Sequence, residues 1–275
     1  VRQLALHLRT AMQKKTAETF QVVYCWQYMH CLKLWVALLV AAAAAASQDD
    51  NNNNNNGRVE DTQSLASLVF PLTEIIHGVV RLLPTTRNLP LRLHCARHLQ
   101  QLAASFSCFV PTTSILLEAL DLREVYQKPL KIANRASTRG LQLQHTLRLP
   151  KESTLRTTEQ LDTCMAEVFL LLNREIDLYR YSPGFSEFSV RVQQRLRKFA
   201  KETKNAKWRS FAKGSLELCD KYSTFCIKAR SKLQQAPKDV KRLEALLPRD
   251  EPNMYKRLVA SLEKEKQAEA PIRPK

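Results

Sequence analysis

Two histidines, His94 and His98, lie four residues apart within an apolar stretch. Four residues make about one turn of an α-helix, so both imidazoles can face one side and hold Zn²⁺ if two further ligands converge on them. Cys25, His30 and Cys31 are candidates for those ligands. The chain has no paired cysteine motif, and both histidines also suit a helix boundary, so structural roles are favoured over a metal-dependent enzyme.

A second pattern with catalytic potential is the Glu-x-x-His step formed by Glu74 and His77. Di-iron helical bundles use this step twice and need two further glutamates, and no second copy occurs in the chain. The nucleophile elbow Gly-x-Ser-x-Gly and the metalloprotease motif His-Glu-x-x-His do not occur either. The five glycines stand too far apart to gather backbone amides around a phosphate. We therefore predict a non-catalytic protein without metal or cofactor.

The net charge of +17 is concentrated in one part of the chain. Residues 187–242 carry sixteen basic residues against five acidic ones, which exceeds ordinary interspersed surface charge and favours contact with a polyanion. The alternatives are a solvated face that only keeps the protein soluble, and contact with an acidic protein. Because aromatic residues do not alternate with the cations, we expect contact with the RNA backbone rather than with bases. The candidate RNA-binding residues are Arg191, Arg197, Lys198, Lys201, Lys204 and Lys207, with Arg135 and Arg139 in an earlier basic segment.

Aromatic residues gather in the N-terminal part of the chain, around Trp26 and Trp35. Such a helix forms either part of the core or a surface for a partner, and the core is the safer interpretation. The candidate partner-binding residues are Trp26, Trp35, Arg81, Arg87 and Arg92.

Helices must position all of these residues, because apolar side chains recur at intervals of three and four through most of the chain. The expected parts are N-terminal helices (1–46), a low-complexity disordered insert (47–62), central helical hairpins (63–127), a basic extended connector (128–156), C-terminal helical repeats with a basic face (157–247), and a terminal helix and tail (248–275). The pattern predicts an all-α chain, and an irregular stacked-helix solenoid of the HEAT/armadillo type is favoured over a bundle. Only residues 141–149 alternate in the manner of a strand.

The uninterrupted apolar run at residues 34–46 is shorter than the roughly 20 residues that a membrane span requires, so we expect a buried helix there. The seven cysteines occur singly within apolar runs, which favours reduced thiols in a reducing compartment. The chain begins at Val1 with an amphipathic pattern, so we expect a further N-terminal portion and no signal peptide.

Several passages resemble the nucleolar complex protein 2 family of ribosome-assembly factors, and the resemblance extends over nearly the whole chain. The most specific run continues from residue 70 to residue 111. The matching passages are residues 1–9, 14–15, 26, 30–35, 70–72, 78–85, 89–95, 109–111, 147–151, 199–201, 229–232 and 237–239. The alanine and asparagine tracts depart from the family pattern, and residues 152–154 lack an expected aromatic residue.

This resemblance implies a helical-repeat scaffold in the nucleolus and nucleoplasm, which pairs with nucleolar complex protein 1 in early precursors of the large ribosomal subunit and with protein 3 in later ones. It further implies binding to the pre-ribosomal particle and its rRNA, a hetero-oligomer rather than a homo-oligomer, no membrane association, and support of precursor maturation and nuclear export. The alternative functions are a karyopherin-like transport adaptor and a general helical-repeat module for binding proteins.

Overall fold

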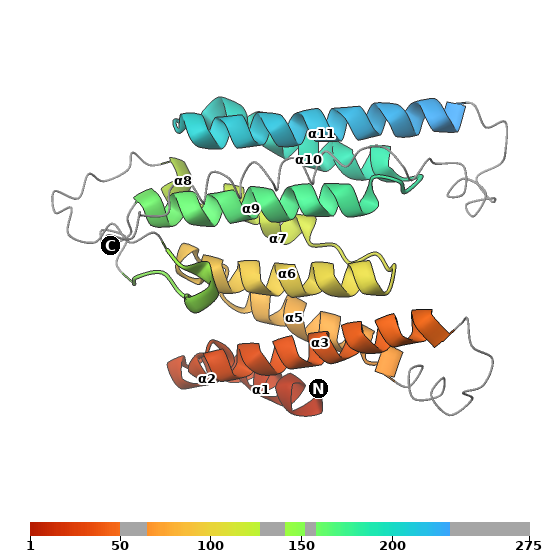
Figure 1. The fold of residues 1–275 in the computed structure, drawn as a ribbon. Coiled ribbons are helices and arrows are strands. Elements are labelled where there is room, and N and C mark those ends of the chain that lie inside the picture. The colour runs from red at the N-terminus through yellow and green to blue at the C-terminus, as the bar shows by residue number, and fades with distance from the viewer. Residues whose placement is uncertain (50–64, 127–140, 152–157, 232–275) are drawn as a thin grey trace, which may run out of the picture. The chain divides into compact units, whose positions relative to one another are not determined.

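The computed structural model describes residues 1–49, 65–126, 141–151 and 158–231, and its regular elements in these residues are all helical (Figure 1). The α-helices are α1 (Arg2–Lys14), α2 (Ala17–Val23), α3 (Trp26–Asp49), α5 (Val69–Leu82), α6 (Leu89–Ser105), α7 (Thr113–Leu120), α8 (Arg123–Tyr126), α9 (Thr158–Tyr179), α10 (Phe185–Glu202) and α11 (Ala206–Ser231). Two short 3₁₀ turns, η1 (Thr86–Asn88) and η3 (Leu143–His145), lie between them. The predicted all-α class is confirmed.

The chain forms two compact units, residues 1–168 and residues 169–275, and α9 crosses the boundary between them. The expected solenoid and the expected division into parts therefore stay predictions, and the predicted terminal helix and tail (248–275) lie outside the described residues.

The first unit is built around the hairpin of α5 and α6. A buried face of α5 includes Leu72, Ile76 and Val79, and α6 is buried along most of its length. Proline cannot continue a helix, so Pro84 ends the first arm, while Pro90 suits the first turn of the second arm, where its missing N–H is not needed. The two prolines therefore bracket the turn between α5 and α6.

Two tyrosine hydroxyls connect the N-terminal helices α1, α2 and α3, one to this hairpin and one between α3 and α1. Tyr24 donates a hydrogen bond to the carbonyl of Val79 on α5 (3.2 Å), and Tyr28 donates one to the carbonyl of Leu4 on α1 (2.9 Å). Both tyrosines are buried, so each hydroxyl gains a partner that replaces water. The start of α3 packs near the start of α6, because Trp26 lies edge-on to His94 with ring centroids 5.8 Å apart.

The apolar run at residues 34–46 was predicted to be a buried helix. It lies in α3, but only Val36 and Leu39 of the run are buried, so the prediction of burial is wrong for most of it. Tyr28, Met29, Leu32, Val36 and Leu39 are buried, whereas the alanines from residue 41 to residue 46 are exposed or half-buried. Among the described residues, the stretch Ala17–Ala46 is long and apolar enough to cross a membrane by length and composition alone, and 22% of its most apolar window is buried. Core helices and membrane spans both meet this criterion.

Residues 141–151 do not form the strand that their alternation suggested. Leu147 and Leu149 are buried, and two backbone hydrogen bonds hold them to the hairpin: Leu91 N–H donates to the Leu147 carbonyl (3.1 Å), and Leu149 N–H donates to the Arg87 carbonyl (2.7 Å). The alternation therefore reflects a short segment that lies against the α5–α6 turn, with one set of side chains buried. The described part of the predicted extended connector is docked in this way.

The second unit packs the latter part of α9 with α10 and α11. Phe169 contacts Phe211 (ring centroids 5.7 Å), and Ser215 donates a buried hydrogen bond to Asn173 (2.7 Å). Both pairs are 42 residues apart, so α9 and α11 run parallel with a fixed register. Phe169 also contacts Phe199, and Tyr179 contacts Phe188, which makes α10 antiparallel to α9.

Helix α10 buries one narrow apolar face. Phe185, Val192, Leu196 and Phe199 are buried, and Phe188 is half-buried. The opposite side of α10 is exposed and carries the basic residues. The candidate site therefore lies on the exposed, basic side of α10.

Two helical glycines allow a matched test of the packing between α1 and α5. A Cβ atom at Gly78 would lie 2.6 Å from Cδ2 of Leu8, whereas a Cβ atom at Gly214 would have nothing within 4 Å. We expect Gly78→Val to lower the free energy of unfolding by about 1–3 kcal/mol because it overpacks this contact. Gly214→Val should change it by less than about 0.5 kcal/mol, since valine and glycine differ little in helix propensity. Denaturant unfolding followed by circular dichroism checks both, and equal losses from the two variants would contradict the packing described.

Candidate nucleic-acid interface

The hairpin of α10 and α11 presents a cationic surface. Eleven basic side chains are exposed on these helices and the turn between them, against four exposed acidic ones. The basic residues are Arg191, Arg197, Lys198, Lys201, Lys204, Lys207, Arg209, Lys213, Lys221, Lys228 and Arg230. The acidic residues are Glu187, Glu202, Glu217 and Asp220. We call the exposed basic side chains the α10–α11 cationic surface.

Cations are densest at the turn of this hairpin, residues 203–205. The buried Thr203 leaves α10, its carbonyl accepts a hydrogen bond from the Arg209 guanidinium (2.6 Å), and the Asn205 side chain caps α11 by accepting from Lys207 N–H (2.9 Å). This local geometry reverses the chain, so that Lys201 and Lys204 lie near Lys207 and Arg209. A single acidic residue, Glu202, falls between residues 198 and 209.

Two ion pairs on this surface, those of Arg197 and Lys198, are weak. Arg197 lies 3.5 Å from Asp220 and Lys198 lies 4.0 Å from Glu202, with all four side chains about half exposed. Exposed pairs of this kind contribute at most about 1 kcal/mol and compete poorly with a polyanion. Among the described residues, no ion pair engages Arg191, Lys201 or Lys204.

The surface offers charge but no exposed aromatic ring. Trp208, at the start of α11, is buried, and Phe211 is half-buried against Phe169. Stacking of bases needs exposed aromatic rings, so this arrangement suits phosphate groups rather than bases.

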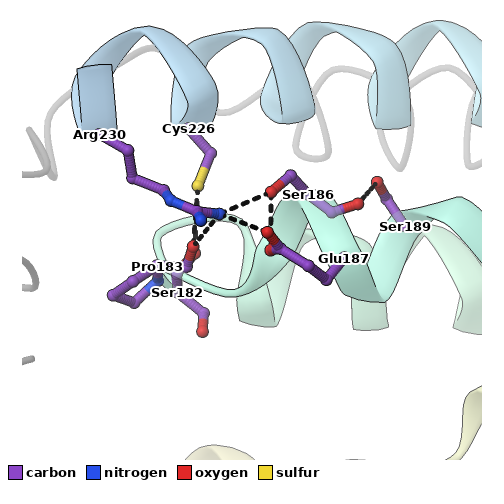
Figure 2. A network of polar contacts seen from close by, with 7 residues as sticks. All are labelled: Ser182, Pro183, Ser186, Glu187, Ser189, Cys226 and Arg230. Atoms are coloured by element: carbon purple, nitrogen blue, oxygen red, sulfur yellow. Dashed lines mark hydrogen bonds and ion pairs between the residues drawn. The ribbon is translucent and has the colours of Figure 1, made fainter. Parts of the chain in front are cut away.

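A network at the far end of the hairpin fastens the end of α11 to the start of α10 (Figure 2). The Arg230 guanidinium donates to the carboxylate of Glu187 (2.6 Å), to Oγ of Ser186 (3.0 Å) and to the carbonyl of Pro183 (3.3 Å). The Cys226 thiol also donates to the Pro183 carbonyl (3.3 Å). Hydrogen bonds from Arg230 and Ser186 lower the pKa of Glu187 to about 2. Arg230 is therefore committed to the hairpin and is not a free cation.

The prediction that Arg92 binds a partner is wrong. This residue is 2% exposed, and its guanidinium pairs with Glu118 and donates to the Ile115 carbonyl (3.4 Å). A buried arginine that joins α6 to α7 cannot contact a partner, so its role is structural. Arg81 is exposed, whereas Arg87, Trp26 and Trp35 are half-buried. The predicted RNA-binding residues Arg135 and Arg139 lie outside the described residues.

The candidate zinc histidines have structural partners. Nε2 of His94 donates to the carbonyls of Leu143 (2.9 Å) and Thr146 (3.3 Å), which holds residues 141–151 on α6. Burial lowers the pKa of His98 to about 4, and its Nδ1 pairs with Gln101 (3.3 Å). In the described parts of the chain, no three or more His, Cys, Asp or Glu side chains are grouped to hold a metal ion.

Other groups that could take part in catalysis are also dispersed or inert. Glu74 is exposed while His77 is buried, so they do not form one site. Burial raises the pKa of the Cys95, Cys164 and Cys219 thiols to about 12, far above the range in which a thiolate nucleophile forms at neutral pH.

Sequence analysis did not single out Arg209 and Lys213. Both were counted among the basic residues of 187–242, but only the chain reversal at 203–205 brings them alongside the cations of α10. The signal that could have placed them is Asn205, a residue type preferred at helix N-termini, directly before the new apolar pattern.

The Arg230–Glu187 pair should make stability depend on pH. Because folding lowers the pKa of Glu187, the pair stabilises the folded chain above the ordinary carboxyl pKa, and this stabilisation is lost as the pH falls toward about 2. The pair is exposed, so the effect should be at most about 1 kcal/mol. We expect Glu187→Gln to remove it at pH 7, with the difference from the unchanged protein vanishing near pH 2. Denaturant unfolding across this pH range measures it, and a constant difference at every pH would contradict the assignment.

Comparison with known proteins assigns the family. The profile of the Noc2p family matches residues 1–259. The nucleolar complex-associated protein 2 of Arabidopsis thaliana is 32% identical over 240 residues, which cover 87% of this chain and 28% of that protein. The nucleolar complex protein 2 of Drosophila melanogaster is 30% identical over 232 residues, covering 84% of this chain and 27% of that protein.

A Noc2 family protein of Schizosaccharomyces pombe is 29% identical over 245 residues, covering 89% of this chain and 32% of that protein. The chain thus spans about a third or less of the length of these relatives. The match nevertheless includes α1 to α11. The resemblance noted in the sequence is therefore confirmed, and this chain belongs to the Noc2p family.

Proposed function

We propose that this chain is a non-catalytic scaffold in ribosome biogenesis that acts in the nucleolus and nucleoplasm. Its relatives carry the name nucleolar complex protein 2, which supports the nucleolus as its place of action. The separated candidate groups and the buried thiols described above support a binding role over a catalytic one.

The α10–α11 cationic surface is the observation on which the RNA-binding part of this proposal rests. The surface contacts the phosphate backbone of precursor rRNA through Arg191, Lys198 and Lys201 on α10 and through the cations at residues 203–213. The long, exposed ion pairs of Arg197 and Lys198 leave these two charges available, and displaced counterions supply much of the binding free energy. Arg197, which is loosely paired with Asp220, adds a further phosphate contact.

The protein partners in this proposal are helical-repeat assembly factors of the nucleolar complex protein 1 and protein 3 type, bound in a hetero-oligomer without a membrane. The helices stack as a HEAT/armadillo-like solenoid in the whole protein, and the assembly supports maturation and nuclear export of the large-subunit precursor. The antiparallel hairpins α5–α6 and α10–α11 support this architecture, because solenoids are built from such hairpins.

Charge reversal on α10 tests RNA binding. In the full-length protein, Arg191→Glu, Lys198→Glu and Lys201→Glu together should weaken binding to a precursor rRNA fragment at least tenfold near physiological salt. The slope of log affinity against log salt should become shallower by about 2–3, because roughly one counterion is released per phosphate contact. Fluorescence anisotropy across a salt series measures both quantities, and circular dichroism verifies unchanged helix content.

The matched control reverses three exposed cations of α1, Arg2, Arg9 and Lys14, and makes the same change in net charge. This control variant should lower RNA affinity much less, because it alters only the long-range electrostatic field of the protein and no contact with the RNA. Equal losses from the two triple variants, or none from the α10 variant, would refute the assignment of this surface. Retained RNA binding with loss of an acidic protein from the purified particle would instead assign the surface to a protein.

A further inference from the structure

Three segments of the first unit contain no charged residue. Residues 34–48, 65–73 and 99–117 together comprise 43 positions without Asp, Glu, Lys or Arg, although such residues make up 25% of the chain. At that average, these segments would hold about eleven charges. The depletion includes exposed positions such as Leu34, Ala66, Phe70, Ala104 and Phe109, so burial in the core does not explain it.

The fold brings the three segments to one end of the first unit. Helices α5 and α6 are antiparallel arms of a hairpin, so the start of α5 lies beside the end of α6. Helix α3 runs alongside α6 in the same direction (Figure 1), and Trp26 near its start contacts His94 near the start of α6. Figure 1 shows the end of α3, the start of α5 and the end of α6 on the same side. We call this part of the molecule the uncharged end.

Large apolar side chains are exposed at the uncharged end. Phe70 is 73% exposed, Phe109 63%, Leu34 69% and Leu38 45%. Since a phenylalanine buries about 150–250 Å² when fully covered, the two rings alone leave on the order of 270 Å² of aromatic surface in solvent. This area approaches that of the largest apolar patch on a typical monomer, and such patches commonly mark interaction sites.

Helix α3 extends the uncharged end beyond the hairpin. Counted from the Trp26–His94 contact at about 1.5 Å per residue, the charge-free part of α3 continues to Gln48, roughly 16 Å past Ser105, the last residue of α6, and Asp49 then ends α3. Its exposed positions Leu34, Leu38, Ala41 and Ala45 follow one another at helical spacing. The two leucines can fill gaps between side chains of another helix, and the alanines permit close approach of its backbone.

We propose that the uncharged end docks a protein partner through an apolar, uncharged helix face. Interface cores are depleted in charged residues and enriched in aromatic ones, as this end is. Nucleic acid fits poorly, because the three segments contain no cation to meet its phosphates. The partner surface must itself lack charge, since a charged group buried here would find no counter-charge.

Other occupants fit less well. Interfacial membrane helices carry Lys and Arg on their polar face to hold anionic headgroups, and the exposed positions of the three segments offer none. The chain's own residues 50–64 contain six consecutive asparagines and a single large aliphatic residue, Val59, so they offer little apolar area to cover it. The inference deepens the proposed function, on which it rests, by naming the surface for a protein partner.

Site-specific crosslinking tests this surface. We would place the photoreactive amino acid p-benzoylphenylalanine at Phe70, and separately at Phe109, in the full-length protein in cells, with Val22 as the control position. Val22 is 46% exposed and lies next to the start of α3, away from the uncharged end. Mass spectrometry should show that both test positions crosslink to the same partner protein, at peptides from an apolar helix face without charged residues. The control position Val22 should not crosslink to these peptides. Crosslinks to RNA, to lipid, to a second copy or to residues 50–64, or no crosslink at all, would overturn the proposal.

Serine substitutions then measure affinity for the protein so identified. The full-length double variant Phe70→Ser, Phe109→Ser should raise its Kd at least tenfold, while Val22→Ser leaves it within about twofold. If the double variant loses helix content, Leu38→Ser supplies the same test on α3. Anisotropy with precursor rRNA separates the two proposals, because these variants should retain RNA binding. An unchanged Kd would contradict the docking surface, whereas unchanged RNA binding by the α10 variant would contradict only the RNA-binding part of the proposed function.

Discussion

The packing around α6 organises the first unit, because this helix is buried on most of its surface. Helices α3, α5 and α7 and residues 141–151 all contact it. Such a position excludes unpaired charge, and α6 accordingly pairs its two internal arginines, Arg92 with Glu118 and Arg97 with Glu167. These pairs join α6 to α7 and α9, while His94 holds residues 141–151, so polar groups set where the neighbouring elements attach.

An α-helix satisfies the backbone hydrogen bonds in its interior, which leaves the outer side chains free to vary in chemistry between parts of the chain. The second unit uses this freedom to gather cations on α10 and α11, with Asn173 and Ser215 fixing the register beneath them. In the first unit, the uncharged end carries no charged residue on its three segments. Two surfaces of opposite chemistry on one chain are what a protein that joins RNA to another protein requires.

Helical periodicity and proline positions predicted much of this structure. The turn between Pro84 and Pro90, the buried face of α10 and the all-α class required only local rules, because each depends on residues close in sequence. Arg92 could not be placed in this way, since its partner Glu118 lies 26 residues away and only the tertiary fold buries Arg92 beside it. The segment 141–149 was ambiguous for a similar reason, because its alternation arises from docking on α6 and not from a sheet.

The candidate surfaces were predictable to different degrees. The excess of cations on residues 187–242 is visible in composition, but the gathering of Lys201, Lys204 and Arg209 depends on the turn at Thr203. The uncharged end was not predicted, because apolar runs such as residues 34–46 resemble core until their exposure is known. Trp26 was predicted to bind a partner because it is aromatic, but its side chain is half-buried, whereas those of Phe70 and Phe109 are exposed.

The central claim is that RNA and protein contact different surfaces of this chain. Ultraviolet crosslinking of the full-length protein in cells, followed by mass spectrometry of nucleotide-bearing peptides, tests it most directly. The account predicts nucleotide adducts on peptides from α10, the 203–205 turn and α11, and none on residues 34–48, 65–73 or 99–117. Adducts on those uncharged segments, or their absence from α10 and α11, would contradict it.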